Sequence, residues 1–181
     1  LGVASSLNDR FWRLRFCDDL KAMAMAQRLS VPETIGRILA GRNVSFEEAE
    51  TYLQPRLRDS LPDPSLMKDM DLAAKRIAKA ILRRESVAVF GDYDVDGATS
   101  AALLVRFFRA VGSSINIYIP DRLIEGYGPN LPALLKLNES GVRLVITVDC
   151  GISAHEALAG AADAGLDVIV VDHHLAGPDL P

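Results

Sequence analysis

Short apolar runs alternate with amphipathic stretches over the last hundred residues of the chain. Four runs rich in β-branched residues are typical of buried strands: residues 85–90, 115–119, 144–148 and 168–171. Between them, three segments have helical spacing of apolar positions: residues 101–108, 131–138 and 154–164. Such alternation predicts an α/β fold, an open parallel sheet with helices on both faces.

A longer amphipathic segment precedes the first of these strands. Residues 69–84 are predicted to form a helix, and the residues suited to its buried side are Leu72, Ile77, Ala80 and Ile81. This helix leads directly into the strand at residues 85–90.

The first sixty or so residues have a different pattern, of small helices separated by breakers. Helices are predicted over residues 18–29, 32–39 and 49–53, the last behind a capping box formed by Ser45 and Glu48. Three prolines, at positions 55, 62 and 64, predict a linker. We therefore expect a helical N-terminal segment and linker over residues 1–66 and an α/β domain over residues 67–181. The basic and aromatic stretch at residues 10–16 could bind single strands, but a packed N-terminal strand is the favoured interpretation.

The composition of the chain disfavours several classes of protein. The chain has 181 residues, of which 49% are hydrophobic, but no apolar run approaches the length of a membrane span. Residues 1–16 carry scattered arginines instead of the continuous apolar stretch of a signal peptide, so we expect a cytoplasmic protein. The two cysteines, Cys17 and Cys150, are far apart in sequence, which disfavours a disulfide framework or a zinc ribbon.

Charge is unevenly distributed although the formal net charge is only -4. From Gly141 onward, Arg143 is the only arginine or lysine among several acids. Basic residues gather instead just before the first strand, at Lys68, Lys75, Arg76, Lys79, Arg83 and Arg84. This group is compatible with a helix that faces phosphates, but a solvated helix face is the favoured interpretation.

The turn after the first strand carries three carboxylates, at Asp92, Asp94 and Asp96. Like charges so close together repel one another unless a cation or protons neutralise them, so the turn predicts a divalent metal site. An EF-hand loop is disfavoured, because Leu103 stands where the bidentate Glu belongs. A haloacid dehalogenase-type phosphotransferase, with Asp94 as nucleophile, and a solvated turn that merely caps a helix are the remaining alternatives.

Two further clusters follow later strands of the predicted sheet. Asp149 follows the third strand, and Asp172, His173 and His174 follow the fourth. Ligands in such folds bind at the carboxyl ends of the strands, so all three clusters are expected on one rim. Carboxylates and imidazoles suit Mn²⁺ or Mg²⁺ better than structural zinc, and Cys150 is expected to pack under the site as a small apolar residue.

These motifs resemble those of the DHH phosphoesterases. Asp94-x-Asp96, Asp149-Cys150-Gly151 and Asp172-His173-His174 are similar to the first three motifs of that superfamily. The wider turn at residues 91–100, residues 119–122 and the segment at residues 125–128 resemble its single-strand-specific DNA exonucleases. The resemblance extends from about residue 12 to the end of the chain. Phe90 occupies the place where the superfamily's pyrophosphatases carry a His, which favours the nuclease branch and leaves one metal a ligand short.

The resemblance also implies that more of the protein exists than this chain. The family continues into a fourth motif and a separate substrate-binding domain, whereas the chain ends at Pro181 and does not begin with Met. We therefore interpret the chain as an N-terminal fragment.

The resemblance implies two-metal hydrolysis of phosphodiester bonds in single-stranded DNA, 5'-to-3', in DNA repair and recombination. Two Mn²⁺ or Mg²⁺ ions would lie about 3.5–4 Å apart. The implied metal ligands are Asp94, Asp96, Asp149 and His173. Asp149 is the expected bridge, because its strand is expected to be central in the sheet. Single-strand-binding protein and a helicase are candidate partners, and a non-catalytic DHH-like DNA-binding protein is a further alternative.

Further roles are expected for residues around the metal ligands. His174 would contact the phosphate or the leaving group, Asp172 would orient an imidazole, and Asp92 would be a further ligand or would position water. The helix N-terminus at residues 97–100 would offer backbone N–H donors to the substrate. Arg122 and Tyr127 would contact DNA, by clamping a phosphate and stacking on an unpaired base. An ordinary surface turn flanked by glycines is the alternative interpretation of this segment.

Overall fold

The computed structural model describes Arg10 and residues 17–181. The chain divides between Asp63 and Pro64 into two compact units. Residues 11–16, on which the single-strand-binding alternative rests, lie outside the described residues. No helix within the described part of the chain is both long enough and apolar enough to cross a membrane.

The first unit is built from short helices. They are α1 (Asp19–Leu29), α2 (Glu33–Gly41), α3 (Ala49–Leu53) and α4 (Leu57–Ser60). Met25 and Leu39 are fully buried in its small core. The capping box forms as predicted, since the Ser45 hydroxyl accepts from the Glu48 N–H at 3.1 Å and the Glu48 carboxylate accepts from the Ser45 N–H at 3.3 Å. The segment predicted as a plain linker contains α4 and the 3₁₀ helix η1 (Pro64–Leu66), neither of which buries a side chain.

The second unit alternates helices and strands. Its elements are α5 (Met70–Arg83), β1 (Ser86–Gly91), α6 (Val95–Ala110), β2 (Asn116–Tyr118), α7 (Leu131–Glu139), β3 (Val142–Val148), α8 (His155–Asp163) and β4 (Asp167–Val171). The four strands form one parallel sheet in the order β2-β1-β3-β4. The predicted fold class, an open parallel sheet with covering helices, is confirmed.

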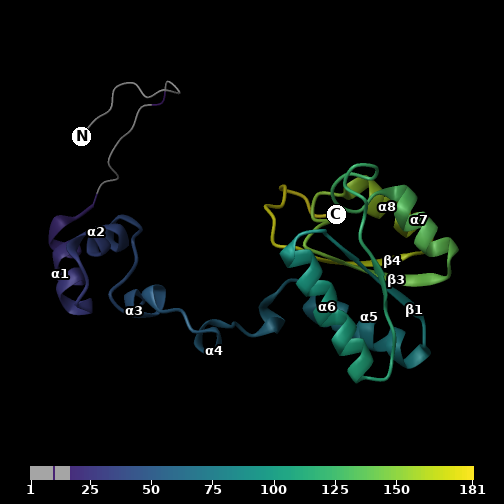
Figure 1. Ribbon diagram of the computed structural model, residues 1–181, viewed down its shortest axis with the longest axis horizontal. Helices are drawn as coiled ribbons and strands as arrows, with labels where there is room; N and C mark the ends of the chain where they lie inside the picture. The colour runs from purple at the N-terminus through teal and green to yellow at the C-terminus, as the bar shows by residue number, and fades with distance from the viewer. Residues whose placement is uncertain (1–9, 11–16) are drawn as a thin grey trace. The chain divides into compact units, whose positions relative to one another are not determined.

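The alternation of side chains along β1 divides the core into two layers. Val87 and Val89 pack with residues of α5 and α6, whereas Ala88 and Phe90 pack with residues of α7 and α8. Figure 1 shows these two helix pairs on opposite sides of the strands. Both faces of β1 are therefore covered, which explains why its sequence is continuously apolar instead of alternating.

Strand order and register bring the three predicted clusters to one edge. β1 and β3 are adjacent at the centre of the sheet, where connections leave in opposite directions. Gly91 pairs with Val148, and Val148 pairs with Val171. The residue that follows each of these strands, Asp92, Asp149 or Asp172, therefore leaves the sheet at the same edge, where ligands bind in such folds.

Candidate metal centre

The turn between β1 and α6 fixes two carboxylates in different environments. Asp92 is buried, with 4% of its surface exposed. Asp94 is the N-cap of α6, and its Oδ1 accepts the N–H groups of Asp96 at 2.9 Å and Gly97 at 3.1 Å. These hydrogen bonds, that from Gly97 above all, lower the pKa of Asp94. Asp94 is therefore held as an ionised carboxylate with one oxygen engaged in the cap.

Gly97 lets the helix start directly against the backbone of Asp92. A Cβ at this position would lie 2.3 Å from the carbonyl oxygen and 2.6 Å from the amide nitrogen of Asp92. Both contacts are with backbone atoms, so no side-chain movement could relieve them. The glycine in this turn is thus required for the approach of α6 to the site, in addition to any role in flexibility.

Asp149 occupies a strained position at the end of β3. Its φ of 61° is in the left-handed region, which Asp tolerates better than most residues. Its side chain is only 5% exposed, and its N–H donates to the carbonyl of Val171 at 2.9 Å. Burial and the adjacent Asp94 carboxylate raise the pKa of Asp149. Two close carboxylates with pKa values displaced in opposite directions form a site where a cation would relieve repulsion.

The segment after β4 supplies a carboxylate and two imidazoles. Asp172 accepts from the Ile152 N–H at 3.0 Å and contacts Nδ1 of His174 at 2.7 Å. Burial alone would raise the pKa of Asp172, but its hydrogen bonds with Ile152 and His174 hold it lower. The hydrogen bond with Asp172 raises the pKa of His174. Asp172 therefore contacts the His174 imidazole, and its role in orienting that ring stays a prediction.

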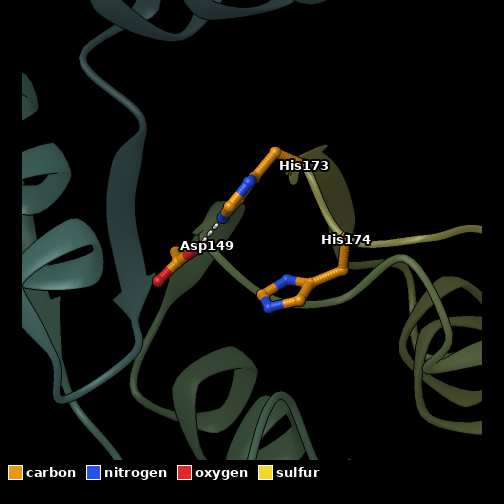
Figure 2. A group of neighbouring side chains, drawn as sticks. All are labelled: Asp149, His173 and His174. Atoms are coloured by element: carbon orange, nitrogen blue, oxygen red, sulfur yellow. Dashed lines mark hydrogen bonds and ion pairs between the residues drawn. The ribbon is translucent and has the colours of Figure 1, made fainter. Parts of the chain in front are cut away.

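The His173 side chain points toward Asp149, which follows β3. Its Nε2 lies 3.0 Å from Oδ1 of Asp149. Figure 2 shows the contact between the Asp149 carboxylate and the His173 ring as a dashed line, with the ring of the next residue, His174, beside them. The two rings lie 4.8 Å apart between centroids.

The described residues contain two groups whose potential ligand atoms all lie within 4.8 Å of one another, and both include Asp149. One group is Asp92, Asp94 and Asp149, and the other is Asp149, His173 and His174. Asp149 is common to the two groups, and its role as a bridge between metal ions stays a prediction. Asp96 belongs to neither group, so the four expected ligands do not converge as one set. Asp96 is exposed in the first turn of α6.

A buried oxygen without a protein partner shows that this site suits a cation. Among the described residues, Oδ1 of Asp92 is buried and receives no hydrogen bond. Such an atom is costly unless something positive neutralises it. Carboxylate and imidazole donors together match the preference of Mn²⁺, and the carboxylates also match Mg²⁺.

Cys150 has the packing role expected from the sequence. It is fully buried and free, and burial raises the pKa of its thiol to about 12. A neutral thiol is a poor metal ligand, because the thiolate is the binding form.

The expectation that the N-terminus of α6 offers N–H donors to a substrate is wrong for its first turn. Asp94 accepts the N–H groups of Asp96 and Gly97 through its carboxylate and that of Ala98 through its carbonyl, the last at 2.9 Å. These three N–H groups are therefore already hydrogen-bonded to Asp94 and are not available to bind a phosphate.

The two residues expected to contact DNA lie on the loop between β2 and α7. The Arg122 guanidinium carbon is 4.7 Å from the centre of the Tyr93 ring, a cation–π arrangement beside the metal turn. The Tyr127 hydroxyl donates to the carbonyl of Asp149 at 2.9 Å. Neither the contact of Arg122 with Tyr93 nor that of Tyr127 with Asp149 was predicted from the sequence. The glycines on either side of Tyr127 were the one sequence signal of an unusual backbone there.

The basic residues ahead of β1 are partly explained by structure. Arg76 forms ion pairs with Glu85 at 2.7 Å and with Asp167 at 2.5 Å. Arg76 therefore ties α5 to the amino-terminal ends of β1 and β4, opposite the metal centre.

Comparison with known proteins identifies relatives of this chain. Residues 86–181 match the DHH family, N-terminal domain. The single-stranded-DNA-specific exonuclease RecJ of Bacillus subtilis (strain 168) is 40% identical over 172 residues, which are 94% of this chain and 22% of that protein. RecJ of Thermus thermophilus is 37% identical over 153 residues, 80% of this chain and 22% of that protein.

Solved structures give the same relationship. A crystal structure of exonuclease RecJ bound to manganese is 38% identical, with a TM-score of 0.59, over 67% of this chain and 30% of that one. A crystal structure of Thermus thermophilus RecJ in complex with Mn²⁺ is 27% identical, with a TM-score of 0.66, over 93% of this chain and 23% of that one. The chain thus spans about a quarter of the length of these relatives.

Proposed function

The chain belongs to the DHH family, and from that membership and the geometry of the metal centre we propose that it forms the metal-binding part of a single-stranded-DNA exonuclease. The observation that carries the proposal is that potential ligand atoms of Asp92, Asp94 and Asp149 lie within 4.8 Å of one another, and that Oδ1 of Asp92 is buried without a hydrogen-bond partner among the described residues. The named relatives are single-stranded-DNA-specific exonucleases, and both of the RecJ structures described above contain manganese.

The carboxylates and His173 are proposed to hold Mn²⁺ or Mg²⁺. Asp94, Asp149 and His173 are proposed as the primary ligands and Asp92 as the further ligand. Asp96 would have to change its side-chain conformation to bind the same metal ions. The bound cations supply a nucleophilic water at neutral pH and neutralise charge on the scissile phosphodiester.

The other residues are proposed to act on the substrate. His174, held by Asp172 and half-exposed, donates from its free ring nitrogen to the phosphate or the leaving oxygen. Arg122 is exposed on the same loop as Tyr127 and pairs with a DNA phosphate. The exposed part of the Tyr127 ring is available for stacking on a base.

The proposal extends to biological context. Digestion is 5'-to-3', in cytoplasmic DNA repair and recombination, with single-strand-binding protein and a helicase as candidate partners. The domain boundary is proposed between residues 66 and 67, three residues after the division between the two compact units. The haloacid dehalogenase alternative is not favoured, because residues 86–181, which contain these motifs, match the DHH family.

Metal removal tests the proposed activity in the intact protein. Single-stranded oligonucleotides labelled at either end should be degraded with Mn²⁺ present, and a chelator should abolish degradation until Mn²⁺ is restored. Label at the 5' end should be released first, and a blunt duplex of the same sequence should persist. Full degradation in the chelator, or no degradation of single strands with Mn²⁺, contradicts the proposal.

A further inference from the structure

The loop between β2 and α7 reaches the metal centre through the hydroxyl group of a tyrosine. Tyr127 Oη donates to the main-chain carbonyl of Asp149 at 2.9 Å and lies 3.4 Å from Nδ1 of His174. The Tyr127 and His174 rings meet edge to face, 5.9 Å apart between centroids. One side chain therefore contacts both the backbone of the shared carboxylate residue and an imidazole.

The carbonyl that accepts this hydrogen bond belongs to the strained residue of the site. Asp149 has a φ of 61°, and Gly151 just beyond it has a φ of 113°. A backbone in the left-handed region persists only where its surroundings hold it. The N–H of Asp149 is held by the carbonyl of Val171, and its carbonyl is held by Tyr127. The two contacts together fix the peptide units on either side of the Asp149 Cα.

The loop is built to present this tyrosine. Gly126 and Gly128, on either side of it, both have φ values near 80°, which side chains rarely adopt. Gly128 is buried, and a Cβ there would lie 3.9 Å from Cβ of Cys150. The backbone beside Tyr127 is thus packed against the residue that follows Asp149.

We propose that Tyr127 is a positioning residue that holds the strained Asp149 backbone, and thereby the shared carboxylate, in the geometry that binds metal. The inference rests on the proposed function for its metal. It gives Tyr127 a role besides stacking on a base, and that role depends on the hydroxyl group alone.

Removing only the hydroxyl separates the two roles. In the intact protein, Tyr127→Phe should weaken Mn²⁺ binding, measured by titration with electron paramagnetic resonance, by about tenfold, as is typical for groups that orient metal ligands. The maximal rate on single-stranded DNA should fall while KM for DNA changes less than about twofold, because the ring that would stack is retained. Tyr127→Ala should weaken Mn²⁺ binding equally and also raise KM.

A matched control removes a tyrosine hydroxyl from the first unit. Tyr52→Phe deletes a hydrogen bond of 3.2 Å with Arg42 and should leave Mn²⁺ affinity unchanged. Wild-type Mn²⁺ affinity in Tyr127→Phe, with the melting temperature preserved, overturns the inference and leaves the proposed function standing. If the unsubstituted protein binds Mn²⁺ at this site but does not degrade single-stranded DNA, only the proposed function fails, and the affinity comparison still decides the role of Tyr127.

Discussion

Replacing Asp149 by Asn in the intact protein should abolish Mn²⁺-dependent degradation of single-stranded DNA. Because Asp149 is the residue common to both groups of potential ligands, its loss weakens the binding of every cation at the site. Metal ions contribute several kcal/mol to such reactions, so the rate should fall by about a thousandfold or more. Single-turnover kinetics with labelled oligonucleotides would measure the change.

Asparagine is the appropriate replacement because of the backbone at this position. Asn adopts the left-handed region at least as readily as Asp, whereas Ala at a φ of 61° would add strain. Asp149→Asn should therefore keep its circular dichroism spectrum and unfold cooperatively. Asp163→Asn, which changes an exposed residue at the end of α8, is the matched control and should keep full activity. Nuclease activity within about tenfold of wild type in Asp149→Asn would remove Asp149 from the centre of the mechanism.

Removing the His174 imidazole should lower the maximal rate by about a hundredfold or more, the size typical of general acid–base groups. His174→Gln should nevertheless bind Mn²⁺ with nearly wild-type affinity, because Asp92, Asp94, Asp149 and His173 remain. The rate and the affinity should be measured on the same preparation. Equal losses in both would make His174 a metal ligand instead of a group that contacts substrate.

The pH profile gives an independent check on the same pair. The hydrogen bond with Asp172 raises the pKa of His174, so an imidazolium donor is present below that pKa and is lost as pH rises through it. Asp172→Asn removes the cause of the increase. The alkaline limb of the rate profile should therefore move to lower pH in Asp172→Asn. If the alkaline limb lies at the same pH in Asp172→Asn as in the wild type, His174 is not the protonated group on which the rate depends.

Much of the site was predictable because it follows from topology. In a parallel sheet every strand ends at the same edge, so acids after the first, third and fourth predicted strands had to converge. The sequence also indicated which residue would be shared, because the third strand is central. The fold class followed from the period of the apolar positions alone, and the boundaries of most elements differ from the prediction by a few residues.

The features of the site that the sequence did not predict depend on the directions of individual side chains and N–H groups. The helix N-terminus after Asp94 suggested free N–H donors, but the direction of the Asp94 side chain decides that they are used in the cap. Asp96 is two residues from Asp94, yet a helical first turn carries it out of both ligand groups. The contact between Tyr127 and Asp149 joins residues 22 apart in sequence, and no periodic pattern encodes it.

Locating manganese in crystals of the intact protein tests the central claim most directly. Crystals grown with Mn²⁺ and measured near the manganese absorption edge should show an anomalous peak in contact with the Asp149 carboxylate. Asp92 and Asp94 should lie on one side of that carboxylate and His173 on the other. Manganese bound elsewhere, with the Asp149 carboxylate uncoordinated, would contradict the account.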